Sequence, residues 1–80
     1  MYNKLLRVIS EILDVPLNEM PMDSSPDTIA SWDSMRQIDI VMAVEEEFGI
    51  RFKDSDIPRL FGIRGFEQVL KEHIESAYGD

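Results

Sequence analysis

The sequence predicts an all-α protein, a small four-helix bundle that forms one domain over residues 1–80. Three observations support this fold class. Apolar residues recur at helical spacing in several stretches, prolines gather between the first two of them, and 80 residues are enough for a single core. The third helix is the shortest, and a long loop joins the first helix to the second.

The first helix is predicted from about Asn3 to Asp14, and Pro16 ends it. Its apolar residues recur as on one face of a helix: Leu5, Leu6, Ile9, Ile12 and Leu13. From Val15 to Asp33, prolines alternate with Asp, Ser and Asn, which indicates a loop with room for one helical turn. Loops of this length are uncommon in compact domains and tend to be functional.

The second helix is predicted to begin at Asp33 and Ser34, where Asp33 can cap free backbone amides, and to end at Gly49. Helical spacing places one apolar arc toward the core: Met35, Ile38, Val41, Met42 and Phe48. The opposite arc carries the outward residues: Arg36, Asp39, Ala43, Glu46 and Glu47. We expect Arg36 to pair with Asp39, three residues further on.

The rest of the chain predicts two more helices. Ile50–Phe52 is expected to be extended, Ser55–Pro58 to start a short third helix, and Gly62 to precede the last one. The apolar face of that last helix comprises Ile63, Phe66, Val69, Leu70 and Ile74. We expect Trp32 to anchor the long loop against the bundle and His73 to lie at the surface or in packing. Residues expected in the core include Met42, Ile57, Leu60 and Val69.

The charge excludes several classes of function. Eight basic and 16 acidic residues give a net charge of −8, and the segment Glu11–Glu47 holds ten acids and one base. Nucleic acids and anionic membranes are bound through Lys and Arg, so basic protein surfaces are the expected partners, although a merely solvated acidic surface fits equally well. No apolar run can span a membrane and no export signal is recognisable, which predicts a cytoplasmic protein.

Conventional catalytic residues are nearly absent. With no Cys and one His, the chain has no thiolate nucleophile, disulfide or Cys/His metal site. Asp23–Asp27 begins like a calcium loop, but Thr28 replaces the required glycine and Ser34 the bidentate acid. A serine hydrolase built on Ser34 and His73 lacks the Gly-x-Ser-x-Gly element. The sequence therefore predicts no metal, no catalytic residue and no enzyme.

Trp32–Met35, together with Glu45–Ile50, resembles the acyl carrier protein family, which has an Asp-Ser-Leu-like motif at the start of its second helix. The resemblance covers nearly the whole chain. It implies that Ser34 is esterified by 4′-phosphopantetheine taken from coenzyme A, whose terminal thiol carries acyl groups as thioesters. It also implies that Asp33 is recognised by the modifying transferase, besides capping the helix. A thiol supplied by an attached group is consistent with a chain that has no cysteine.

The resemblance also suggests partners with basic docking surfaces: a phosphopantetheinyl transferase, a loading ligase, and synthases or transferases. The residues assigned to these contacts are Met35, Arg36, Asp39, Glu45, Glu46 and Glu47. Of the acids, Glu45 lies nearest to the apolar side. Met35 stands where the family usually has Leu, and either borders the arm or packs half-buried. Arg36 stands where fatty-acid carriers commonly have an acid, which favours a specialised pathway.

Three functions remain open at this stage. One is a monomeric acyl carrier of fatty-acid, polyketide or other specialised biosynthesis. Another is an aminoacyl or peptidyl carrier of the D-alanyl or nonribosomal type, because the Asp-Ser-Met motif does not distinguish the cargo. The third, from a different class, is an unmodified acidic helical adaptor. Whether an acyl chain is held inside the bundle, among residues such as Met42 and Val69, is also open.

Overall fold

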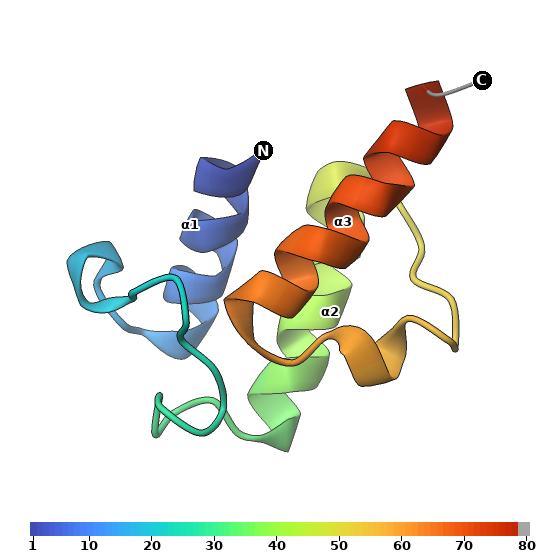
Figure 1. Cartoon of the computed structure of the whole chain (residues 1–80). Helices are drawn as coiled ribbons and strands as arrows, with labels where there is room; N and C mark the ends of the chain where they lie inside the picture. Colours follow the sequence, from blue (N-terminus) through green and yellow to red (C-terminus); the bar gives the residue numbers. More distant parts are fainter. Residues whose placement is uncertain (79–80) are drawn as a thin grey trace.

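The structure is a computed structural model and describes residues 1–78. Within these residues the chain forms three α-helices and two 3-10 turns, with no β-strand (Figure 1). In chain order they are α1 (Tyr2–Leu13), η1 (Leu17–Glu19), α2 (Ser34–Phe48), η2 (Ile57–Arg59) and α3 (Gly62–Tyr78). The predicted all-α class is confirmed. None of the helices in this part of the chain is long and apolar enough to cross a membrane.

The predicted count of four helices is not confirmed. Where the sequence predicts a short third helix, starting at Ser55–Pro58, the chain forms only the three-residue turn η2. Shortly after it, Gly62 has a φ of 78°, outside the right-handed helical region, so no helix can run from this segment into α3. The segment is therefore too short for more than a turn.

The predicted ends of α2 are confirmed, and capping explains them. Asp33 Oδ1 accepts a hydrogen bond of 2.8 Å from the backbone N–H of Arg36. Gly49 is left-handed, with a φ of 65°, and its N–H donates to the carbonyl of Glu45. α1 begins and ends one residue earlier than predicted, and its earlier end follows from Asp14, which already has a left-handed φ of 57°.

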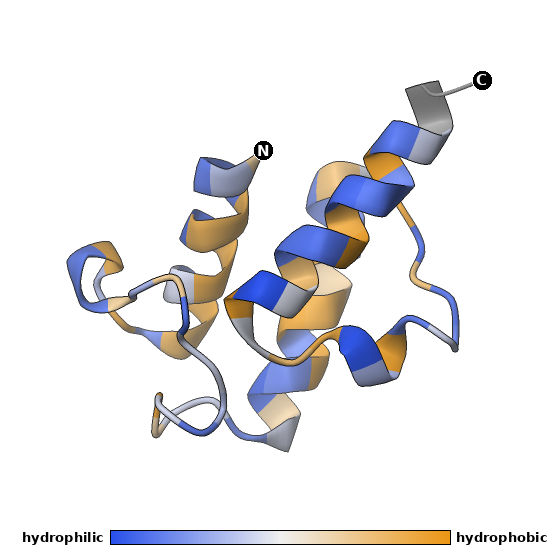
Figure 2. Cartoon of the chain, in the orientation of Figure 1, coloured by the Kyte–Doolittle hydropathy of each residue, from blue (hydrophilic) through white to orange (hydrophobic). Residues whose placement is uncertain are grey.

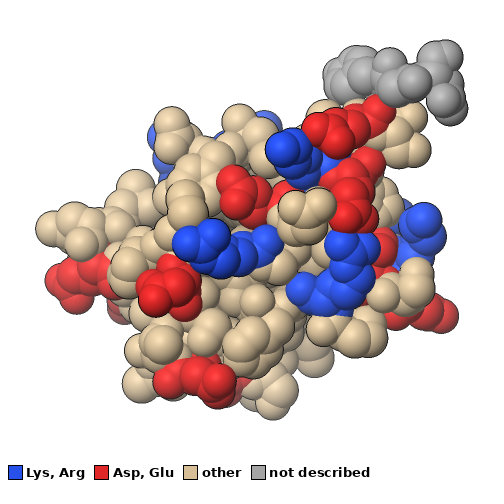
Figure 3. Space-filling model, in the orientation of Figure 1, with Lys and Arg blue, Asp and Glu red and all other residues tan. Residues whose placement is uncertain are grey.

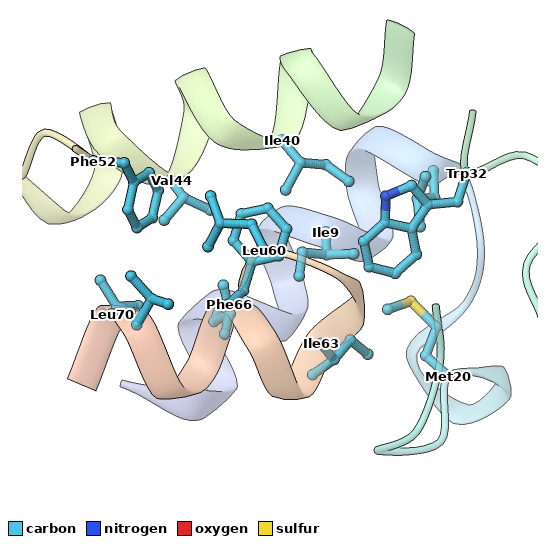
Figure 4. Close-up of a cluster of buried hydrophobic side chains, with 13 residues drawn as sticks. Ile9, Met20, Trp32, Ile40, Val44, Phe52, Leu60, Ile63, Phe66 and Leu70 are labelled. Carbon is cyan, nitrogen blue, oxygen red and sulfur yellow. The ribbon is translucent and has the colours of Figure 1, made fainter. Parts of the chain in front are cut away.

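The three helices enclose one core. α1 packs most closely against α2 and also approaches α3. Between α2 and α3 large side chains fill the space: Figure 4 shows Ile40 and Val44 on one side of the core and Phe66 and Leu70 on the other. Hydrophilic residues cover the side of α3 that faces the viewer in Figure 2. The buried apolar side chains are Leu5, Ile9, Leu13, Met20, Trp32, Ile40, Val44, Phe52, Leu60, Ile63, Phe66, Val69 and Leu70.

The predicted inward arc of α2 is wrong for three of its five residues. Met35, Ile38 and Met42 are 75%, 59% and 62% exposed, whereas Ile40 and Val44 are fully buried. Val41 and Phe48 of the predicted arc do pack against the core. The physical reason is that α2 carries apolar residues around most of its circumference, so its periodicity does not select the buried side. Contact with α1 and the core selects the side of Ile40 and Val44.

Of the remaining core predictions, two are confirmed and one is wrong. Leu60 and Val69 are buried, as predicted, but Ile57 is 46% exposed and, like Met42, lies outside the core. Ile57 is exposed because it belongs to η2, a turn too short to present an inward face of its own. On α2, Ile40 and Val44 supply the buried side chains in place of Met42.

The long loop between α1 and α2 is fastened to the helices at several points. The hydroxyl of Ser31 donates to the carbonyl of Leu13 at 2.9 Å, and the N–H of Ile63 donates to the carbonyl of Ser24 at 3.0 Å. A Cβ at Gly62 would lie 2.8 Å from that same Ser24 oxygen, so only glycine fits there. These contacts fix the loop that leads into Ser34.

Candidate functional site

The start of α2 presents an exposed serine, Ser34, as the first helical residue. The turn that precedes it is fixed, because Asp33 accepts from the N–H of Arg36 through its side chain and from the N–H of Gln37 through its carbonyl, at 2.8 and 2.9 Å. The first N–H groups of a helix have no partner inside it, and the positive end of the helix dipole lies there. A negatively charged group attached to the Ser34 hydroxyl is therefore favoured.

An apolar hollow of about 390 Å³ adjoins Ser34. Its walls come from the long loop, the first turn of α2 and the segment around η2: Pro26, Trp32, Asp33, Ser34, Gln37, Ile57, Pro58, Leu60 and Phe61. Its volume is at the small end of the roughly 300–1,000 Å³ that small-molecule sites occupy. A flexible chain attached to Ser34 can lie against these walls.

Gln37 joins the three walls of the hollow. Its side-chain oxygen accepts a 2.7 Å hydrogen bond from the indole N–H of Trp32, and its side-chain nitrogen donates to the carbonyl of Leu60, also at 2.7 Å. An indole N–H only donates and a carbonyl only accepts, so the orientation of the Gln37 amide follows. Trp32 is 2% exposed, which confirms that it anchors the long loop.

Arg36 pairs with a different acid from the one predicted. Its Nη1 lies 3.7 Å from Oδ2 of Asp33, three residues before it, and not beside Asp39. The reason is that side chains of a helix lean toward its N-terminus, which carries the guanidinium back toward the cap. The positive charge therefore lies at the same end of α2 as Ser34.

The predicted acidic stripe is only partly available to a partner. Asp39 and Glu46 are exposed, and within residues 1–78 neither takes part in an ion pair. Glu47 is exposed as well, but its Oε1 lies 3.8 Å from Nζ of Lys4 on α1. Glu45 is half-buried, and its Oε2 accepts a 2.8 Å hydrogen bond from the backbone N–H of Phe52. Glu45 thus holds the segment after α2 in place.

An exposed apolar strip runs along α2 from the residue after Ser34. It consists of Met35, Ile38 and Met42, whose spacing of three and four residues places them on one face. Asp39 and Glu46 border this apolar strip, because Asp39 lies four residues after Met35 and Glu46 four residues after Met42. On the face of the molecule seen in Figure 3, Lys and Arg lie among Asp and Glu.

Comparison with known proteins identifies the family. The chain is 33% identical to an acyl carrier protein of Buchnera aphidicola over 71% of its own length and 72% of the relative's. It is 31% identical to an acyl carrier protein of Cyanidium caldarium, over 91% and 85% of the two lengths. The chain belongs to the acyl carrier protein family. An acyl carrier protein of Petrotoga mobilis is 26% identical over 92% of this chain and 87% of its own, and no family model matches.

A cluster of polar residues also lies on the α3 side of this member of the acyl carrier protein family. Asp56 is 6% exposed, and its Oδ2 accepts from the N–H of Lys53 at 2.9 Å and lies 2.8 Å from Nε2 of His73. The hydrogen bond with His73 lowers the pKa of Asp56 most, and the one with Lys53 adds to it. The His73 ring packs edge to face on Phe52, at 5.7 Å, so its predicted packing role is confirmed.

A bidentate ion pair lies next to this cluster. Arg59 of η2 donates from Nη1 and Nη2 to the two carboxylate oxygens of Glu72 on α3, at 2.8 and 2.6 Å. Arg59 first, and then Gln68, lower the pKa of Glu72 to about 2. Together with Asp56 and His73, this pair ties the segment after α2 to α3, and with it the wall of the hollow beside Ser34.

Gln37 is not among the predicted site residues, although the sequence contains a signal for it. Gln37 lies three residues before Ile40 and seven before Val44, so all three share a face of α2. An uncharged polar residue on a buried face needs hydrogen-bond partners. The assignment of the inward face to Met35, Ile38 and their neighbours hid that signal. No local signal points to the pairing of Asp56 with His73, which are 17 residues apart.

Proposed function

We propose that this chain carries acyl groups as thioesters on a 4′-phosphopantetheine group attached to Ser34, and delivers them to enzymes of fatty-acid, polyketide or other specialised biosynthesis. The observation that supports this proposal most is the position of Ser34 in a member of the acyl carrier protein family: exposed, at the start of α2, and beside an apolar hollow. The chain acts as a single carrier domain and catalyses no reaction itself.

The residues around Ser34 fit such a group. Its phosphodiester would be attached through Ser34 Oγ, where the free N–H groups of the helix start favour an anion. Trp32, Ile57 and Phe61 offer apolar contact for the chain that follows. When bound, the group supplies the thiol that the sequence lacks. Asp33 fixes the helix start by capping it. Because it directly precedes Ser34, it is also the residue that a modifying transferase would recognise.

Partner enzymes would dock on the apolar strip of Met35, Ile38 and Met42. A surface of this kind in water is typical of a binding site when it is continuous and bordered by charge. Asp39 and Glu46 border it, so the complementary partner surface is an apolar patch flanked by Lys and Arg. Glu45 and Glu47 contribute less, because their carboxylates already interact with Phe52 and Lys4.

Intact-mass spectrometry tests the modification. The native chain is incubated with coenzyme A and a broad-specificity phosphopantetheinyl transferase, and we expect it to gain the mass of one phosphopantetheine. Ser34→Ala should gain nothing. Ser55→Ala is the matched control, because Ser55 is also exposed and also follows an Asp, and this variant should be modified like the native chain.

Two results would contradict the proposal. No mass gain in the native chain would favour the unmodified acidic adaptor, whereas a gain that persists in Ser34→Ala would move the attachment site. Circular dichroism of each variant shows that it is folded. Mass spectrometry of the arm recovered from cells then distinguishes an acyl from an aminoacyl or peptidyl cargo.

A further inference from the structure

We infer that the Arg36 guanidinium binds the phosphodiester at Ser34. Its positive charge then offsets the repulsion between the phosphodiester and the Asp33 carboxylate. This inference rests on the proposed function, because it concerns the group that Ser34 would carry. Arg36 would thus have a role within the carrier itself, besides the predicted contact with partner enzymes.

Arg36 is placed for this role by the fold of the first turn of α2. Its guanidinium reaches back to the capping residue Asp33, which directly precedes Ser34. The separation of 3.7 Å is longer than the about 2.7–2.9 Å of a charge-assisted hydrogen bond, and the Arg36 side chain is 44% exposed. The guanidinium therefore lies near the helix start, and its N–H groups can still bind a second anion besides Asp33.

A positive charge is needed at this end of α2 once Ser34 carries a phosphodiester. A phosphodiester adds a negative charge directly beside the Asp33 carboxylate, and the two repel each other. Arg36 is the one base between Glu11 and Glu47, so no neighbouring residue in sequence can offset that repulsion. Arginine has five N–H donors in a planar fork, enough to bind a carboxylate and a phosphate oxygen together.

Other side-chain donors near Ser34 are already engaged. The indole N–H of Trp32 donates to Gln37, and the side-chain nitrogen of Gln37 donates to the carbonyl of Leu60. Asp33 is an acceptor when ionised. Arg36 thus supplies the side-chain hydrogen bonds to the phosphate, and backbone N–H groups at the helix start supply the others. The arm beyond the phosphate stays free to move between the hollow and a partner.

Nuclear magnetic resonance of the arginine side chains in the native chain tests this inference. The Nε–Hε signal of Arg36 is assigned in the unmodified protein by its absence from Arg36→Lys. On modification of the native chain, we expect this signal to shift and its hydrogen exchange to slow roughly two- to fivefold, the range for an exposed ion pair. The signals of the other arginines, including Arg59 in its ion pair with Glu72, should change little.

Mass spectrometry of the same sample separates the two proposals. A sample without the added mass contradicts the carrier function and the inference together. A sample that carries the group but shows an unchanged Arg36 signal overturns the inference alone. As a second readout, the ³¹P signal of the modified chain should depend on salt concentration, and Arg36→Gln should reduce this dependence. Arg7→Gln, an exposed control on α1 beside the other half of α2, should keep it.

Discussion

The two faces of α2 carry similar side chains but differ in burial. The inward face holds Ile40 and Val44, which are fully buried, and the outward face holds the apolar strip of Met35, Ile38 and Met42. Single exposed apolar residues are normal on proteins. Three aligned ones that begin directly after Ser34 and are bordered by Asp39 and Glu46 form a patch, and such patches mark binding sites. Hydrophobicity alone thus does not distinguish the core from the exposed strip that we propose as a docking surface.

The largest effect on stability is expected on the inward face. Ile40→Ala should lower the free energy of unfolding by about 2–5 kcal/mol, because it removes buried methyl groups and leaves a cavity among core side chains. Chemical denaturation followed by circular dichroism measures it. The matched control is Ile38→Ala on the outward face, which should stay within about 0.5 kcal/mol of the native chain. Equal losses in the two variants would contradict the assignment of the faces.

A smaller loss is expected at Gln37, the polar residue of the inward face. Gln37→Met keeps the size of the side chain but leaves the Trp32 N–H and the Leu60 carbonyl without their partner. We expect a loss of about 1–3 kcal/mol, the range for an unsatisfied buried polar group. Tryptophan fluorescence should also change, since Trp32 is the one tryptophan of the chain. Gln68→Met, at an exposed position, should alter neither quantity appreciably.

The α3 side should add a pH dependence that the apolar inward face of α2 does not have. The pKa values of Asp56 and Glu72 are lowered in the folded chain, so the unfolded chain binds these protons more readily and stability falls as the pH is lowered. The contribution of Glu72 is complete above its ordinary pKa of 4.5 and is lost as the pH falls toward about 2. We expect a total effect smaller than that of Ile40→Ala.

Denaturation of two variants between about pH 2 and 5 separates the two carboxylates, whose ordinary pKa values lie within or near that range. His73→Phe keeps a ring against Phe52 but removes the hydrogen bond to Asp56, and should reduce the slope of stability with pH. Arg59→Gln should remove most of the part due to Glu72, since the weaker contribution of the hydrogen bond from Gln68 remains. An unchanged slope in both variants would show that these contacts do not persist in solution.

The smallest effect on stability is expected on the outward face, where the effect on partner enzymes should be largest. Ile38→Gln should change the free energy of unfolding by less than about 0.5 kcal/mol. It should slow modification by the transferase at least about fivefold, equivalent to roughly 1 kcal/mol, if Ile38 is central to the docking surface. The control is Leu17→Gln, also an exposed apolar residue but in η1. Equal rates for Ile38→Gln and the native chain would contradict docking on this strip.

Sequence alone determined the helical class, the ends of α2 and, to within one residue, the ends of α1. Periodic apolar residues predicted α1 and α3, while Asp33 and Gly49 predicted where α2 starts and stops. The motif at Ser34 and the frame around it pointed to the acyl carrier protein family, which the relatives confirm. The helices and their ends depend on residues within about four positions of one another, because helix spacing and capping are local.

Only the tertiary structure decided which side of α2 is buried and what surrounds Ser34. The burial of Ile40 and Val44, in place of Ile38 and Met42, depends on side chains contributed by α1, α3 and the segments between them. The bond from Gln37 to Leu60 joins residues 23 positions apart. When a helix is apolar around most of its circumference, contacts with residues distant in the sequence decide which side is buried. No local sequence pattern encodes those contacts.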